Sequence, residues 1–113
     1  MPKKQKSAPV LVTITVTSRG ITVDQNPVPV RQGEHNIQID WKIETAGWQF
    51  TSDGIVIHRN YLQFIKPRRE NSRWFHWVSR NSHEGERIYE YTINLTNGKN
   101  RLSLDPGIKN GGR

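Results

Sequence analysis

Polar and apolar residues alternate without a break along residues 35–45, which read HNIQIDWKIET. Because the side chains of a β-strand point alternately to its two faces, this pattern predicts a strand with one apolar and one polar face. Burying each apolar side chain is worth roughly 1.5–3 kcal/mol, and a slip of the register by one residue would expose all of them. We therefore expect this strand to lie at the centre of a β-domain. Its apolar members are Ile37, Ile39, Trp41 and Ile43.

Other segments repeat the same period. Residues 10–17 are rich in β-branched residues and have one clearly apolar face, which is typical of a buried strand. Residues 87–96 alternate in the same way, and the Asn97-Gly98 pair that follows them is a strong hairpin signal. Shorter strands are expected at residues 21–23, 28–30, 55–58 and 73–79, separated by turns rich in Gly, Pro, Asn and Asp.

These segments predict the fold class and the organisation of the chain. No stretch has a helical period, and short strands with regular turn signals are typical of an all-β, antiparallel, two-sheet sandwich of seven or eight strands. We expect a disordered basic arm at residues 1–9, a single sandwich domain over residues 10–106 and a flexible tail at residues 107–113. Residues 59–72 show no clean period and are interpreted as the longest loop.

The run PVPVRQGE at residues 27–34, leading into IQIDW at residues 37–41, resembles the cupredoxin-like pattern. In that family a proline-flanked strand and a glycine turn lead into a strand that ends in an aromatic residue. Residues 87–91 are similar to the family's penultimate strand, and immunoglobulin-like sandwiches match almost as well. The resemblance spans about residues 21–96 and implies a fold. It argues against copper and electron transfer, because blue copper needs a Cys thiolate and this chain has no cysteine.

Composition narrows the picture further. With 113 residues and 33% hydrophobic residues, the chain forms one domain with a thin core that depends on its aromatic residues. The absence of cysteine excludes disulfides and thiolate chemistry. The first residues contain no apolar signal region, and no stretch reaches the length of a membrane span, so we expect a cytoplasmic protein without a membrane segment.

The net charge of +7 is unevenly distributed. Residues 1–6 and residues 59–80 carry the whole excess, and the remainder of the chain is close to neutral. Such a distribution favours an anionic partner, although it also aids solubility.

The sequence offers little for catalysis or metal binding. It has no Gly-x-Ser-x-Gly motif, its carboxylates are dispersed, and its glycines form no phosphate-binding loop. We expect no enzyme activity, no cofactor and no metal, although a metal site assembled across strands stays open. The histidines, none of which are paired at a metal-binding spacing, are His35, His58, His76 and His83.

Cations alternate with aromatic rings along residues 59–80, which is what single-stranded nucleic acid requires for phosphate contacts and base stacking. Alternatively, the rings belong to the core and the arginines are solvated. The alternation favours Phe75 and Trp77 facing inward, and the opposite phase, which buries Trp74 and Val78, stays open. The candidate partner-binding residues are Arg59, Tyr61, Lys66, Arg68, Arg69, Arg73, Trp74 and Arg80.

Two functional hypotheses follow from these residues. The first is a non-catalytic binding or structural module that recognises an unidentified protein or anionic partner. The alternative is nucleic-acid binding through the basic arm and residues 59–80. Self-association through sheet edges is a further route to a partner.

Overall fold

The computed structural model describes residues 9–82 and 85–112, and the regular structure within these ranges consists of β-strands. All of the basic arm except Pro9 lies outside the described residues. The ten strands are β1 Val10–Thr17, β2 Gly20–Val23, β3 Val28–Arg31, β4 Ile37–Ile43, β5 Gln49–Ile57, β6 Phe64–Asn71, β7 Trp74–Ser79, β8 Arg87–Thr96, β9 Arg101–Leu104 and β10 Gly107–Gly112. The all-β class predicted from the sequence is therefore confirmed.

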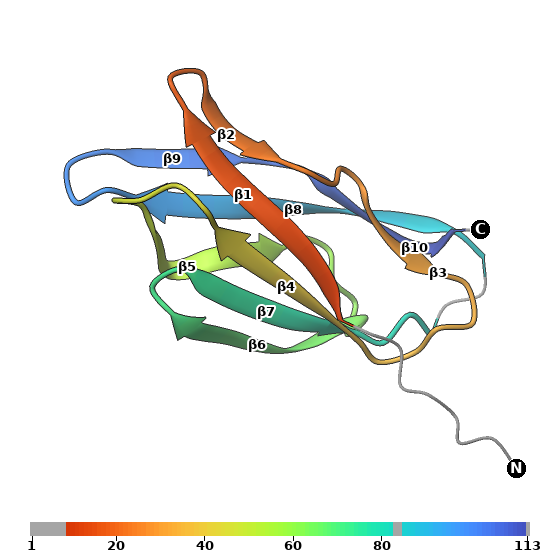
Figure 1. Cartoon of the computed structure of the whole chain (residues 1–113). Helices are drawn as coiled ribbons and strands as arrows, with labels where there is room; N and C mark the ends of the chain where they lie inside the picture. The colour runs from red at the N-terminus through yellow and green to blue at the C-terminus, as the bar shows by residue number, and fades with distance from the viewer. Residues whose placement is uncertain (1–8, 83–84, 113) are drawn as a thin grey trace, which may run out of the picture.

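The first sheet has the strand order β2-β1-β4-β7-β6, so the strand predicted to be central, β4, lies in its middle (Figure 1). β1 runs parallel to β4 and places Val12 opposite Trp41. β7 runs antiparallel on the other side and places Phe75 opposite the same tryptophan. The apolar face of β4 is buried as expected: Ile37, Ile39, Trp41 and Ile43 are at most 5% exposed.

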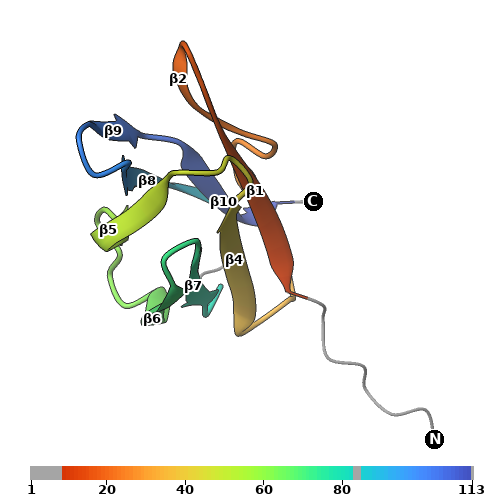
Figure 2. The same ribbon diagram turned by 60° about the vertical axis from the view of Figure 1, so that its left-hand side comes forward.

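The second sheet has the order β3-β10-β8-β5, and β9 also pairs with β8 (Figure 1). Figure 2 shows β10, β8, β9 and β5 of this sheet from another side. β8 is the longest strand and pairs with β5 on one edge. Its other edge pairs first with β10 and then with β9. β10 in turn runs parallel to β3.

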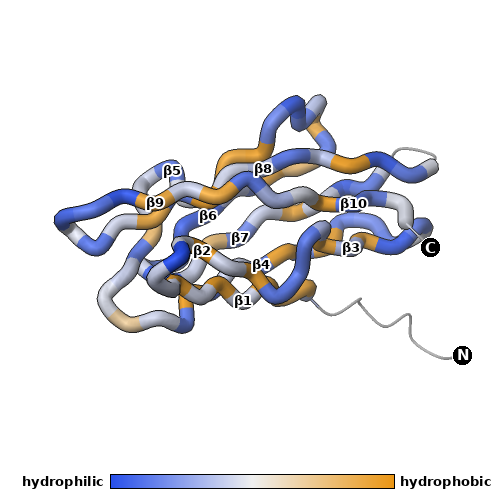
Figure 3. The backbone as a smooth tube through the Cα atoms, turned by 90° about the horizontal axis from the view of Figure 1, so that it is seen from above, coloured by the Kyte–Doolittle hydropathy of each residue, from blue (hydrophilic) through white to orange (hydrophobic). Residues whose placement is uncertain are grey.

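Side chains from the two sheets meet in one hydrophobic core. Apolar positions recur along the strands and the connecting turns are mostly hydrophilic (Figure 3). Three hydrogen bonds, each 3.0 Å long, cross between the sheets within this core. They run from Trp41 Nε1 to the Tyr91 hydroxyl, from Trp77 Nε1 to Ile55 O and from Ser79 Oγ to Asn110 Oδ1.

The predicted phase of β7 is confirmed. Phe75 is 5% exposed and packs edge-on against Phe50, with ring centroids 5.7 Å apart. Trp77 also packs against the core, whereas Trp74 and Val78 lie on the outer face. The alternative phase is therefore wrong.

Two details of the predicted fold are wrong. The sheets are mixed and not purely antiparallel, because β1 pairs in parallel with β4 and β3 with β10. There are ten strands within the described residues and not seven or eight. The additional strands include β6, inside the expected loop at residues 59–72, and β10, inside the expected flexible tail at residues 107–113.

Candidate functional site

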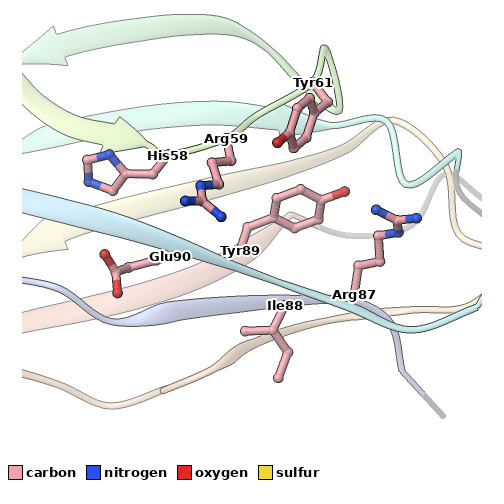
Figure 4. Close-up of a pocket in the computed structure, with 7 residues that line it drawn as sticks. All are labelled: His58, Arg59, Tyr61, Arg87, Ile88, Tyr89 and Glu90. Atoms are coloured by element: carbon pink, nitrogen blue, oxygen red, sulfur yellow. The ribbon is translucent and has the colours of Figure 1, made fainter.

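A pocket of about 700 Å³ opens where the chain leaves β5. It is lined by His58, Arg59 and Tyr61 of the loop that leads to β6, and by residues 87–90 at the start of β8 (Figure 4). β5 belongs to the second sheet and β6 to the first, so this loop carries the chain from one layer to the other. We call this feature the β8 pocket.

The pocket occupies an edge of β8 that β5 leaves uncovered. β5 ends just before this point, where His58 N donates a hydrogen bond to Glu90 O (2.9 Å). On the opposite edge, Tyr91 N donates to Pro106 O (2.9 Å), next to the pairing with β10. In an antiparallel ladder, alternate residues turn their N–H and C=O groups to the same edge. The backbone groups of Ile88 therefore face the pocket.

The loop after β5 is strained and exposes large side chains. Arg59, Tyr61 and Leu62 adopt left-handed φ values of 48°, 48° and 63°. The Asn60 side chain fixes the loop, because its Oδ1 accepts from Phe64 N (2.7 Å) and its Nδ2 donates to Phe64 O (2.9 Å). Each left-handed L-residue costs about 1–2 kcal/mol, and such strain is concentrated at functional sites.

Tyr89 points into the sandwich from the start of β8. It is 5% exposed, and its ring packs edge-on against Phe64 with centroids 5.0 Å apart. Its hydroxyl is buried and has no hydrogen-bond partner among the described residues. Burial raises the pKa of the Tyr89 phenol, so the hydroxyl keeps its proton at neutral pH.

Two arginines flank Tyr89 in the pocket. Figure 4 shows the Tyr89 ring between the side chains of Arg59 and Arg87. Neither guanidinium forms an ion pair with a carboxylate within residues 9–82 and 85–112. The carboxylate of Glu86, next in the chain to Arg87, instead lies 3.3 Å from Lys109 Nζ. The β8 pocket thus carries two exposed guanidinium groups that have no carboxylate partner in the part of the chain that the structure describes.

His58, Thr92 and Asp105 form a hydrogen-bonded chain beside the pocket. The Thr92 hydroxyl donates to Asp105 Oδ1 (2.6 Å), and His58 Nε2 lies 2.6 Å from the same hydroxyl oxygen. Because the Thr92 hydroxyl uses its one hydrogen to donate to Asp105, it can only accept a hydrogen bond from His58. A nucleophilic hydroxyl requires the opposite polarity, in which it donates to the imidazole. The hydrogen bonds of these three residues therefore do not activate the Thr92 hydroxyl as a nucleophile.

The same region contains a group of residues that could form a metal site across strands. His58, Glu90 and Asp105 each offer a ligand atom within 4.8 Å of the others, and all three residues are exposed. Residues able to hold a divalent metal ion are thus brought together, but hydrogen bonds to Thr92 already engage His58 and Asp105. The remaining histidines lie apart: His35 is at Asn81 O, His76 is beside Glu70 and Asp40, and His83 is outside the described residues.

Only part of the basic segment at residues 59–80 reaches the pocket. Arg59 and Tyr61 line it, whereas Arg80 lies exposed at the end of β7, where its N–H donates to Gln63 O (2.7 Å). The other exposed cations follow β6, an edge strand of the first sheet: Lys66, Arg68 and Arg69.

Arg73 and Trp74 are engaged within the fold. Arg73 Nη2 donates to Ile43 O (2.7 Å) and Glu44 O (2.9 Å), and Arg73 Nε donates to Ile43 O (3.1 Å). Trp74 is half-buried, and Lys42 Nζ lies 5.6 Å from the centroid of its ring. These contacts join the turn before β7 to the end of β4. Arg73 and Trp74 therefore stabilise the fold, and their positions do not require a binding partner.

Sequence reasoning missed the half of the pocket that β8 supplies. The alternation along residues 87–96 predicts a strand that contains Arg87 and Tyr89, but nothing in the pattern shows that β5 ends before it reaches them. One signal was present: Ile88 falls on the polar face of that strand, and it is 67% exposed in the structure. Together with the exposed Tyr61 on the facing loop, Ile88 contributes apolar surface to the pocket.

Comparison with protein-family models finds no match for this chain, and comparison with curated proteins finds none either. Within the described residues, no helix is long and apolar enough to span a membrane.

Proposed function

We propose that the protein is a non-catalytic binding module whose partner docks at the β8 pocket. One observation carries the proposal: Tyr61, which lines the pocket, and its chain neighbour Leu62 are 70% and 74% exposed on left-handed backbone. Holding large side chains in water on strained backbone lowers the stability of the free chain, and such strain is concentrated where a ligand is bound. Aromatic residues are also enriched at binding surfaces.

Site-specific photo-crosslinking in cells that make the protein tests this proposal. Tyr61 is replaced by a photoreactive benzoyl-phenylalanine, and Thr22, which is exposed on β2, is replaced in a matched control. A discrete crosslinked product is expected from position 61, with loss of that product when Leu62→Ser is added. Equal products from both positions, or none from position 61, would contradict the proposal.

Nucleic-acid binding is the alternative function. It is supported by the exposed cations along β6, Lys66, Arg68 and Arg69, to which the basic arm outside the described residues would add charge. Trp74 does not contribute a free stacking ring, because it is half-buried beneath Lys42. This function predicts affinity that falls steeply with salt and is weakened by Arg68→Ala with Arg69→Ala on any sequence. Fluorescence polarisation that detects no binding to single- or double-stranded oligonucleotides at low salt would exclude it.

Three further expectations from the sequence remain proposals. Kinship with cupredoxin-like or immunoglobulin-like sandwiches is supported by the two facing sheets and by the Gly33 turn that leads into β4. A cytoplasmic location rests on the sequence alone. Self-association through a sheet edge is disfavoured at β6, where charged residues and Pro67 interrupt edge pairing, so it would use another edge strand.

A further inference from the structure

We infer that the β8 pocket binds an extended peptide segment and holds it by a carboxylate. The carboxylate comes either from the C-terminus of the peptide or from an Asp or Glu side chain. This inference rests on the proposed function and names the class of ligand for the same site.

The donors of the pocket match a carboxylate. Arg59 and Arg87 flank Tyr89, and neither has a carboxylate partner among the described residues. Arginine recognises a carboxylate through two parallel N–H donors, and such charge-assisted hydrogen bonds are about twice as strong as neutral ones. Because Arg59 and Arg87 both line the pocket, a bound carboxylate would supply acceptors to their exposed guanidinium groups.

The uncovered edge of β8 matches the backbone of a peptide. Ile88 turns its N–H and C=O groups toward the pocket, because β5 has already ended and β10 occupies the other edge. An extended peptide that pairs with such an edge gains main-chain hydrogen bonds, which is the mode called β-augmentation. The exposed side chains of Tyr61 and Ile88 lie on either side of this edge and offer contacts for an apolar residue of the peptide.

The same surface suits a nucleic-acid strand less well. Glu90 lies on the rim of the pocket, and its carboxylate would repel a continuous row of phosphates. The cations of β6 belong to the other sheet and do not line the pocket, so they do not extend it into a basic track. A single carboxylate needs only the local pair of arginines.

The test is an NMR titration of the full, ¹⁵N-labelled chain with three matched probes. The first is acetyl-Thr-Val-Phe-Val with a free C-terminal carboxylate, and the second is the same peptide with a C-terminal amide. The third is acetyl-Thr-Val-Asp-Val amide, whose only carboxylate is on a side chain. We expect at least one carboxylate peptide to shift the amide signals of residues 58–63 and 87–90, and the fully amidated peptide to bind at least about tenfold more weakly.

Variants then assign the contacts. Arg59→Gln with Arg87→Gln is expected to weaken binding of the carboxylate peptide at least about tenfold. Arg69→Gln on β6 is the matched control and should leave the affinity unchanged. Which of the two carboxylate peptides binds more tightly distinguishes a C-terminal from a side-chain carboxylate.

The contrary outcomes separate this inference from the proposed function. If the amidated and carboxylate peptides bind equally well, the pocket is still the binding site, but the inference that it recognises a carboxylate is wrong. If an oligonucleotide shifts the pocket signals and none of the peptides does, the inference that the ligand is a peptide is wrong. If no probe shifts these signals the inference fails, and crosslinking at position 61 still decides whether the site binds another partner.

Discussion

The Trp41 indole donates a hydrogen bond of 3.0 Å to the Tyr91 hydroxyl at a point where both side chains are completely buried. Trp41 lies on the central strand of the first sheet and Tyr91 on β8 of the second, so the bond joins the two layers. Tyr91→Phe should lower the free energy of unfolding by about 1–3 kcal/mol, because it leaves the buried indole N–H without an acceptor. Urea denaturation of the variant and the wild type measures this difference.

Tyr89→Phe is the matched control for that loss. The buried hydroxyl of Tyr89 has no partner among the described residues, so its removal should raise the free energy of unfolding, by up to about 1–3 kcal/mol. Equal losses in the two variants would contradict the distinction between the two tyrosines.

The stability of the protein should also fall in alkaline solution. Burial raises the pKa of Tyr91 far above the value of 10.0 that the exposed phenol has in the unfolded chain. The folded state then keeps a proton that the unfolded state releases, so the free energy of unfolding decreases above about pH 10, by up to about 1.4 kcal/mol per pH unit. Denaturation curves between about pH 8 and about pH 11 should show this slope, and Tyr91→Phe should reduce it.

A methyl group at Gly111 should be far more damaging than one at Gly98. Both glycines have positive φ, +75° at Gly111 and +93° at Gly98. A Cβ at Gly111 would collide with the Gly85 carbonyl oxygen, whereas a Cβ at Gly98 meets nothing within 4 Å. We expect Gly98→Ala to cost about 1–2 kcal/mol from the backbone alone and Gly111→Ala to cost about 2 kcal/mol more. Thermal unfolding of both variants measures the difference.

Arg73 should contribute to stability and not to binding. Its guanidinium donates to the carbonyl oxygens of Ile43 and Glu44, and hydrogen bonds from a charged donor are each worth about 1.5–3 kcal/mol when buried and less when exposed. Arg73→Ala should therefore lower the free energy of unfolding by about 1–2 kcal/mol, whereas Arg69→Ala on exposed β6 should change it by less than about 0.5 kcal/mol. Urea denaturation of the two variants gives this comparison, and a similar loss for both would contradict it.

Relief of strain in the loop after β5 should stabilise the free chain. Leu62 has a φ of 63° and is 74% exposed, so its side chain gives little packing in return for the strain. Leu62→Gly removes about 1–2 kcal/mol of backbone strain and adds about 0.5–1 kcal/mol of entropy to the unfolded chain. A net stabilisation of about 0.5–1 kcal/mol is expected, together with weaker peptide binding in the NMR titration.

The alternation of apolar residues predicted the strands that have a buried face. β4 and β8 each carry an unbroken period of two, and the Asn97-Gly98 hairpin after β8 follows its turn residues. β6 was missed because residues 66–71 are all exposed, so an edge strand of this kind carries no apolar period. β10 was missed because its glycines hide the buried Ile108.

The parallel pairings and the pocket are non-local and leave no trace in any one segment. β1 and β4 pair in parallel although two other strands separate them in the chain, whereas turn signals report only on neighbours in sequence. Arg59 and Tyr61 are candidates because they belong to the basic, aromatic segment at residues 59–80. Arg87 is not, because it lies in a separate strand and only the fold brings it to the same pocket. The two sides of the pocket meet only because β5 ends before it reaches the start of β8.

The three hydrogen bonds that cross between the sheets have a consequence for how many packings this chain can adopt. Apolar contacts are non-directional, and a sandwich held by them alone could settle in several offsets of one sheet over the other. Any such offset would leave the fully buried indole N–H of Trp41 without an acceptor, at a cost of about 1–3 kcal/mol, and would also remove the acceptor of the half-buried Trp77 indole. Competing arrangements therefore lie well above the native one, and the energy landscape leads to a single alignment of the layers.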